Sequence, residues 1–318
     1  MPTEARSRPP PRHPVPAPPY VATAEEAARL DAFRLAGGLC DAWFERGSDV
    51  LFVTFDNLLS FGEYDPPQPW LRMRVRRQGF SVLGILASRK DWYRNPDAPA
   101  LIAALRDAGL FEPFSRVVFA GSSMGGFAAL TLSSLVPGST VLAFSPQTTL
   151  SRSIAPFEQR YPRPYRRFDW TTPAFLDARV DAAAASQVWL LYDPFEPEDT
   201  AHAARLADLE QVRAMRFSLF GHGLVWTLRH FGVLDTVIGG IGRGDLDELA
   251  LRRTLRNRRE KRRWQMTLFK AAEQRGHMKL LKMARRRARR LTQAAQQVAK
   301  SGEDGDVRAE PAGPHNDS

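Results

Sequence analysis

The stretch "GSSMGG" at positions 121–126 places a serine hydroxyl between glycines. An apolar run, "RVVFA", precedes it, and "FAALTLSSL" follows with the composition of a helix. A serine at a sharp strand-to-helix turn projects its oxygen beyond the sheet, and glycines two residues away on each side permit that turn. The spacing therefore predicts Ser123 as a nucleophile, with Ser122 as the neighbouring alternative.

A serine hydroxyl becomes a good nucleophile only when a base takes its proton, and the usual base is a histidine oriented by a carboxylate. On α/β sheets these residues follow the serine in the order acid, then histidine. Asp193 comes directly after the apolar run "VWLLY", and His222 lies between two glycines after "AMRFSLF". We expect Asp193 to orient the imidazole and His222 to act as the base; nearby substitutes for the acid are Glu196, Glu198 and Asp199.

The oxyanion of a tetrahedral intermediate requires hydrogen-bond donors. The backbone N–H of Met124, directly after the nucleophile, is the expected first donor. The second should come from the loop "TFDNLLSFG", which contains Asn57 and Leu58. We predict the N–H of one of these two residues, although the loop could simply be capped by its polar side chains.

Six short apolar runs alternate with helical patterns, and such alternation predicts an α/β fold with a mostly parallel sheet. We expect six strands, or slightly more, flanked by helices. A single long helix is predicted at 22–47, with Thr23 as its N-cap. The predicted strands are Val50–Phe55, Ser81–Ala87, Val117–Ala120, Thr140–Phe144, Val188–Tyr192 and Ala214–Phe220, and the later helices are Trp70–Gln78, Ala98–Ala108, Met124–Leu135 and Thr200–Leu209.

Composition divides the chain into a proline-rich arm (1–20), a hydrolase-like domain (21–245), a basic helical tail (246–300) and a polar end (301–318). We expect both ends to be disordered. A cap-like insertion at about 146–186 is rich in arginine and aromatic residues, which suit a sugar or an anionic substrate as well as they suit a solvated loop. The candidate substrate contacts are Tyr161, Arg163 and Tyr165 in this insertion, and Trp92 and Tyr93 near the same rim, where packing is the alternative.

The net charge of +10 is unevenly distributed. Residues 252–290 hold 17 basic and 2 acidic side chains, so the rest of the chain is mildly acidic. Dense positive charge attracts polyanions, so candidate partners of 252–290 are nucleic acid, an acidic membrane surface or an acidic protein; a solvated helix pair is the alternative. The chain carries a single cysteine and no secretory signal or transmembrane pattern, so we expect a cytoplasmic protein, peripheral at the membrane if the tail binds lipid.

Metal-ligand spacings and phosphate-binding glycine loops are missing from the sequence, and we expect no cofactor.

Between Asp49 and Gly232 the chain resembles the α/β-hydrolase superfamily, through "GSSMGGFAAL", "YDPFEP" and "FGHG". It is most similar to a bacterial esterase-like branch with a G-S-S-M-G-G elbow. The resemblance implies ester or acyl chemistry on a small-molecule or glycan ester. The chain departs from larger family members at its front, where only the predicted N-terminal helix precedes "VLFVTF", so we expect the usual leading antiparallel strands to be short or absent.

Three functions are consistent with these residues. The first is a serine hydrolase acting on a carboxylic ester, such as an acylated carbohydrate, through an acyl-enzyme. The second is an acyltransferase that uses the same site with an acceptor alcohol. The third is an inactive hydrolase-like scaffold whose basic tail binds polyanions or an assembly partner.

Overall fold

The computed structural model describes residues 17–61 and 67–306. The chain divides into two compact units, Met1–Leu251 and Arg252–Ser318. Most of the predicted proline-rich arm and most of the predicted polar end lie outside the described residues. The arm's last residue, Tyr20, is described and belongs to the first strand.

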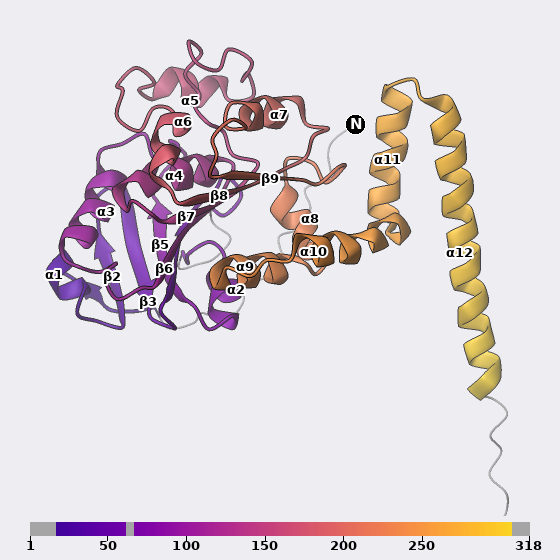
Figure 1. Cartoon of the computed structure of the whole chain (residues 1–318), viewed down its shortest axis with the longest axis horizontal. Coiled ribbons are helices and arrows are strands. Elements are labelled where there is room, and N and C mark those ends of the chain that lie inside the picture. Colours follow the sequence, from indigo (N-terminus) through magenta and orange to yellow (C-terminus); the bar gives the residue numbers. More distant parts are fainter. Residues whose placement is uncertain (1–16, 62–66, 307–318) are drawn as a thin grey trace, which may run out of the picture. The chain divides into compact units, whose positions relative to one another are not determined.

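A nine-stranded sheet forms the centre of the first unit (Figure 1). Its strand order is β1-β2-β3-β5-β4-β6-β7-β8-β9, and every pairing is parallel except β2 with β3 and β3 with β5. The predicted α/β class and mostly parallel sheet are therefore confirmed. The strands are β1 Tyr20–Val21, β2 Ala32–Ala36, β3 Cys40–Glu45, β4 Val50–Phe55, β5 Ser81–Ala87, β6 Arg116–Ser122, β7 Thr140–Phe144, β8 Gln187–Tyr192 and β9 Val212–Arg216.

The predicted helix over 22–47 is wrong, and the leading antiparallel strands are present. Only α1, Ala24–Ala27, is helical, and the Thr23 side chain caps it as expected. The chain then forms the β2–β3 hairpin, whose turn contains Gly38 at φ +79°. Alternating burial along β2 gives a period of two, which the many helix-forming residues nearby conceal in the sequence. The sixth predicted strand, Ala214–Phe220, also has different bounds, because β9 covers Val212–Arg216 and 217–220 form a loop.

Helices cover both faces of the sheet (Figure 1). The helices α3 (Asp97–Asp107), α4 (Met124–Leu132) and α6 (Ala178–Asp181) pack with the larger apolar core, which includes Leu51, Val53 and Phe55. On the other face, α9 (Leu234–Arg243) packs against α2 (Arg72–Arg77) and β4, and Phe52 lies beside Gly242. Burial on both faces explains the continuous apolar strands.

The strand order reverses around β4, because β5 lies on one side of it and β6 on the other. In open α/β sheets, ligands bind beyond the carboxyl ends of the strands at such a reversal. The loop that begins at Asp56 follows β4, and Ser123 follows β6. The topology therefore brings both segments to one edge of the sheet.

The insertion after β7 contains short helices rather than a separate domain. These are α5 Pro162–Arg167, α6, and the 3-10 helix η2 Ala182–Ala184. The helix α7, Pro197–Ala204, follows β8, and the helix α8, Leu224–His230, follows β9. The 3-10 helix η1 Ser133–Leu135 extends α4.

The second unit is helical, and the helix α10, Glu248–Thr254, runs into it. It consists of the 3-10 helix η3 Leu255–Glu260 and the helices α11 Arg262–Gln274 and α12 Met278–Asp306. Gly276, at φ +69°, lies in the turn between α11 and α12, where Ala272 and Leu281 are buried. In the described part of the chain, no helix combines the length and apolarity needed to cross a bilayer.

Candidate active site

Ser123 occupies the turn between β6 and α4. Its backbone has φ +52° and ψ −116°, a conformation that is rare and strained for a residue with a side chain. Its N–H donates to the carbonyl of Phe144 on β7, which fixes the turn against the neighbouring strand. The side chain is 8% exposed. The fold thus holds one hydroxyl in a defined position at the edge of the sheet.

The flanking glycines are required by close backbone packing. A Cβ on Gly121 would overlap the carbonyl of Gly125, the second residue of α4. A Cβ on Gly125 would lie 2.7 Å from the carbonyl oxygen of Phe55, at the end of β4. The spacing of these glycines therefore reflects how closely α4 approaches the two central strands.

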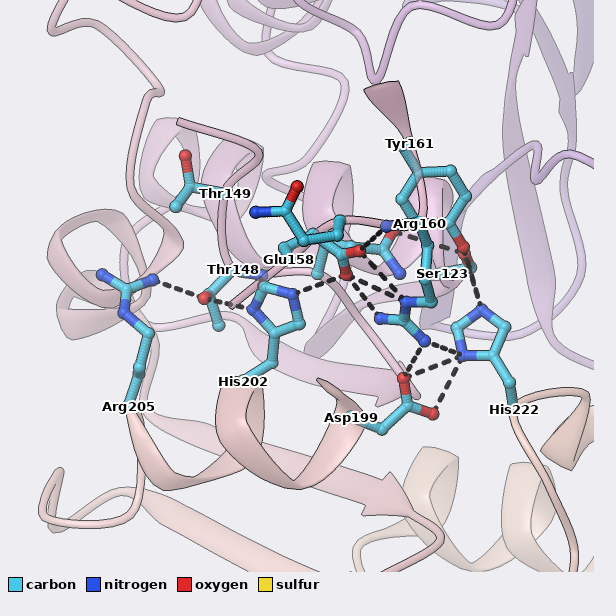
Figure 2. A network of polar contacts seen from close by, with 12 residues as sticks. Ser123, Thr148, Thr149, Glu158, Arg160, Tyr161, Asp199, His202, Arg205 and His222 are labelled. Atoms are coloured by element: carbon cyan, nitrogen blue, oxygen red, sulfur yellow. Dashed lines mark hydrogen bonds and ion pairs between the residues drawn. The ribbon is translucent and has the colours of Figure 1, made fainter. Parts of the chain in front are cut away.

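His222 and Asp199 lie in line with Ser123 (Figure 2). The Nε2 atom of His222 is 3.1 Å from Ser123 Oγ, and its Nδ1 atom is 2.9 Å from both carboxylate oxygens of Asp199. A carboxylate only accepts hydrogen bonds, so Nδ1 carries the proton and Nε2 presents its lone pair to the serine. This is the tautomer that a general base needs.

The structure places Asp199, and not the predicted Asp193, against the imidazole. The Asp193 carboxylate is buried and accepts hydrogen bonds from the backbone N–H groups of Phe195, Leu219 and Gly221, at 2.9, 3.1 and 2.7 Å. It therefore ties the end of β8 to the loop that leads to His222. The prediction went wrong because these backbone donors occupy both oxygens of the first acid after the strand.

Asp199 reaches His222 from the first turn of α7. Its side chain is 0% exposed. Burial raises its pKa, but hydrogen bonding to His222 and the charge of Arg160 outweigh that effect, and the net shift is downward. Asp199 is therefore ionised at neutral pH and can stabilise positive charge on the imidazole of His222.

A buried charge network continues behind Asp199 (Figure 2). Arg160 donates from Nη1 to Asp199 at 2.7 Å, and from Nη2 to Glu158 at 2.6 Å. Nη1 also lies 3.3 Å from Nδ1 of His222. Both of these atoms are donors, so this approach reflects their shared acceptor, Asp199. Arg160 thus fixes the orientation of the carboxylate that holds the base.

His202 completes the network. Its Nδ1 accepts from the backbone N–H of Thr148 at 3.1 Å, so its proton is on Nε2, which donates to Glu158 at 3.1 Å. Burial lowers the pKa of His202. Burial raises the pKa of Glu158, but the bonds from His202 and Arg160 dominate and bring it to about 2. A neutral histidine and an ionised glutamate therefore hold Arg160 in place.

Three side chains surround the Ser123 hydroxyl on its other side. Tyr161 Oη lies 3.5 Å from Ser123 Oγ and 3.4 Å from His222 Nε2, and burial raises the pKa of this phenol, so it stays a hydrogen-bond donor. Gln147 Oε1 accepts from Trp92 Nε1 at 2.9 Å and lies 3.3 Å from Ser123 Oγ. Because the indole can only donate, it fixes which end of the Gln147 amide faces the serine.

The two predicted sources of the second oxyanion donor differ in the structure. The N–H of Asn57 donates to Ser60 Oγ at 3.0 Å, so it is already used within its loop. The N–H of Leu58 makes no hydrogen bond with any described residue. Met124 is the first residue of α4, where a backbone N–H has no partner inside the helix.

The predicted substrate contacts divide into three groups. Tyr161 lies at the site. Trp92 and Tyr93 are buried, at 0% and 4% exposed, and Trp92 packs on the ring of Tyr161, so both support the site from the core. Arg163 and Tyr165 lie on α5, and the guanidinium of Arg152 stacks 4.4 Å from the Tyr165 ring.

No local signal in the sequence indicates the roles of Arg160 and Gln147, and both were missed. For Asp199, the available signal was the acidic first turn of α7.

A cavity of about 350 Å³ is lined by residues next in the chain to Ser123 and His222. Its lining includes Ser122, which precedes the nucleophile candidate, and Gly223, which follows His222. Among the described residues, no group of His, Cys, Asp and Glu side chains has the arrangement of a metal site.

Comparisons with known proteins concern mainly the architecture. No protein-family profile matches the chain, and no curated protein matches it. Among solved structures the chain is similar to the capsule O-acetyltransferase of Neisseria meningitidis serogroup A, at 12% identity and a TM-score of 0.46, covering 64% of this chain and 93% of that one.

Two esterase structures are also similar. An esterase/lipase from an uncultured bacterium has 12% identity and a TM-score of 0.49, covering 70% of this chain and 89% of the other. Carboxyl esterase 2 from the mycorrhizal fungus Tuber melanosporum has 16% identity and a TM-score of 0.46, covering 74% and 93%.

Proposed function

We propose that this chain is a serine hydrolase of the α/β-hydrolase kind that cleaves a carboxylic ester. The observation that carries the proposal is the line of three groups from Ser123 Oγ through His222 to the buried Asp199, at 3.1 and 2.9 Å. The residues come from the segments that follow β6, β8 and β9, at the carboxyl edge of one sheet, where ligands bind in open α/β sheets. Their alignment also fixes the imidazole tautomer that the chemistry needs.

In the acylation step, Ser123 Oγ attacks the ester carbonyl carbon while His222 Nε2 takes the hydroxyl proton. The carbonyl π electrons move to oxygen, and the N–H groups of Met124 and Leu58 are the proposed donors to that oxyanion. Tyr161 lies near enough to add a third donor. When the tetrahedral intermediate collapses, the C–O bond to the alcohol breaks, and the imidazolium gives its proton to the leaving alkoxide.

In the second step, a water molecule attacks the acyl-serine, with His222 again taking the proton. The carboxylic acid leaves, and the proton returns to Ser123. An acceptor alcohol in place of water turns the same intermediate into an acyltransferase reaction, with no change in the roles of the three residues.

A panel of esters tests this proposal. It should run from acetyl to long-chain p-nitrophenyl esters and include acetylated sugars, each with and without an added acceptor alcohol. We expect turnover by the wild type and its loss in Ser123→Ala. Measuring free acid against transferred acyl product separates hydrolysis from acyl transfer. If the folded wild type turned over none of these esters, the scaffold interpretation would be favoured.

A further inference from the structure

We propose that the substrate carries an oxyanion group, a phosphate or a carboxylate, that binds to arginines in the cavity beside Ser123. This inference rests on the proposed function, because it concerns the ester that the site cleaves.

The cavity adjoins the segments that carry the proposed nucleophile and base. Ser122 and Gly223 belong to its lining, and they are the chain neighbours of the proposed nucleophile and base. The rest of the lining comes from the loop after β4, from α2 with the segment before it, and from α8. An ester whose carbonyl lies at Ser123 therefore has its remaining part next to α2 and α8.

Four arginines line this cavity: Arg72, Arg74, Arg77 and Arg229. Its described lining residues include no Asp or Glu. Two of them are already compensated by acids outside the lining. Arg72 pairs with Glu45 at 2.6 Å, and Arg74 pairs with Asp235 at 2.7 Å. The other two guanidinium groups form no hydrogen bond or ion pair with the residues that the structure describes.

Arg77 and Arg229 are exposed, and neither has an acidic partner among the described residues, so both guanidinium groups are accessible to an anion in the cavity. Guanidinium groups bind carboxylates and phosphates through paired hydrogen bonds, which are stronger than bonds between neutral groups. A neutral substrate would leave these charges without a partner, whereas an anion would match them. The arginines come from α2 and α8, so one oxyanion group between them would also contact both sides of the cavity.

Apolar surface beside the arginines indicates what adjoins the anionic group. Trp226, on α8, is 53% exposed, and Met73, on α2, is 42% exposed, and both line the cavity. An exposed indole provides a face for a sugar ring or an alkyl chain. The chemistry therefore fits an ester in which a sugar or short-chain portion connects the carbonyl to a phosphate or carboxylate.

The test compares two p-nitrophenyl esters that differ at one end of the acyl chain: the butyrate, which ends in a methyl group, and the hemisuccinate, which ends in a carboxylate. The measured quantity is the ratio of kcat/KM for the hemisuccinate to that for the butyrate. We expect a ratio of about ten or more in the wild type and a roughly tenfold fall in each of Arg77→Gln and Arg229→Gln, as expected for loss of a charge-assisted bond. Arg29→Gln is the matched control, since it removes an exposed arginine on the far side of the fold from the lining, and its ratio should equal that of the wild type.

A binding measurement separates this inference from the proposed function. Binding of glycerol 3-phosphate, succinate and glycerol to the Ser123→Ala variant is measured by isothermal titration calorimetry, which tells phosphate from carboxylate and both from a neutral polyol. Saturable binding of either anion, lost in the two arginine variants, supports the inference even if no ester is turned over. Turnover with a ratio near one that the variants leave unchanged, and no anion binding, would overturn the inference and leave the proposed function standing.

Discussion

The assignment of Asp199 as the acid makes a prediction that a pair of matched variants can decide. In Asp199→Asn, the amide must place its carbonyl oxygen toward Arg160, because Nη1 donates there at 2.7 Å. The NH2 group then faces Nδ1 of His222, 2.9 Å away. The carbonyl oxygen also stays 2.9 Å from Nδ1, but it is shared with Arg160, whereas the NH2 group opposes a proton on Nδ1 and can donate to that nitrogen. We therefore expect the imidazole to shift toward the tautomer with its proton on Nε2, which presents a donor to Ser123.

The expected loss follows from that change of tautomer. A wrong tautomer of the catalytic histidine costs about 10⁴ in kcat, as found for the corresponding asparagine substitution in a Ser-His-Asp protease. At about 1.36 kcal/mol for each factor of ten, this is roughly 5 kcal/mol of transition-state stabilisation. The assay is kcat/KM for the best ester of the panel, near pH 7.5, with folding checked by circular dichroism.

Asp193→Asn is the matched control. It keeps an oxygen for two of the three backbone donors but places its NH2 group against one N–H, which costs about 1–3 kcal/mol of stability. We expect a fall in Tm of several degrees, with kcat/KM within about tenfold of the wild type. A loss near 10⁴ in Asp193→Asn together with near-normal activity in Asp199→Asn would refute the reasoning and restore the acid expected from the sequence.

Three further predictions concern the charged groups. Arg160→Gln leaves the buried Glu158 without its main partner, so we expect a destabilisation of about 3–5 kcal/mol, measured by urea unfolding; a loss below about 1 kcal/mol would contradict the network. Burial and then the charge of Asp177 raise the pKa of Asp181 to about 6, so ionisation of Asp181 lowers stability as the pH rises from about 4 through 6. Asp181→Asn should therefore stabilise the protein by about 1–2 kcal/mol at pH 8, after allowance for solvent screening, with no gain at pH 3; an equal gain at both pH values would exclude this cause. In the tail, 285–287 are exposed arginines on α12, and their replacement by glutamine should reduce the log–log salt slope of duplex DNA binding by about two to three, whereas an unchanged slope would argue against polyanion binding through α12.

The sequence was a good guide where burial on both faces leaves a strong pattern. The limits of β4, β5 and β7 agree with the predicted runs, because these strands lie between two helical layers. The front of the sheet was missed for the opposite reason. β2 and β3 are rich in alanine and charged residues, and the hairpin is fixed by long-range pairing with β5, which local composition does not reveal.

The candidate site shows the same division. Ser123 comes directly after β6, so its position in the chain predicts where the fold places it. His222 lies six residues after the end of β9, and the glycines on either side of it marked its loop. Asp199 lies seven residues after the end of β8, and its selection over Asp193 depends on which carboxylate the backbone donors of 219–221 occupy. Arg160 reaches Asp199 from 39 residues away in the sequence, and no local pattern encodes that contact.

Reaction with a fluorophosphonate probe, followed by peptide mass mapping, tests the central claim most directly. The probe forms a stable bond with a serine oxygen whose proton a neighbouring base removes. We predict an adduct on the peptide that contains Ser123 in the wild type, and strongly slowed labelling in His222→Ala. A folded wild-type protein that stays unlabelled, or one labelled at another serine, would contradict the account.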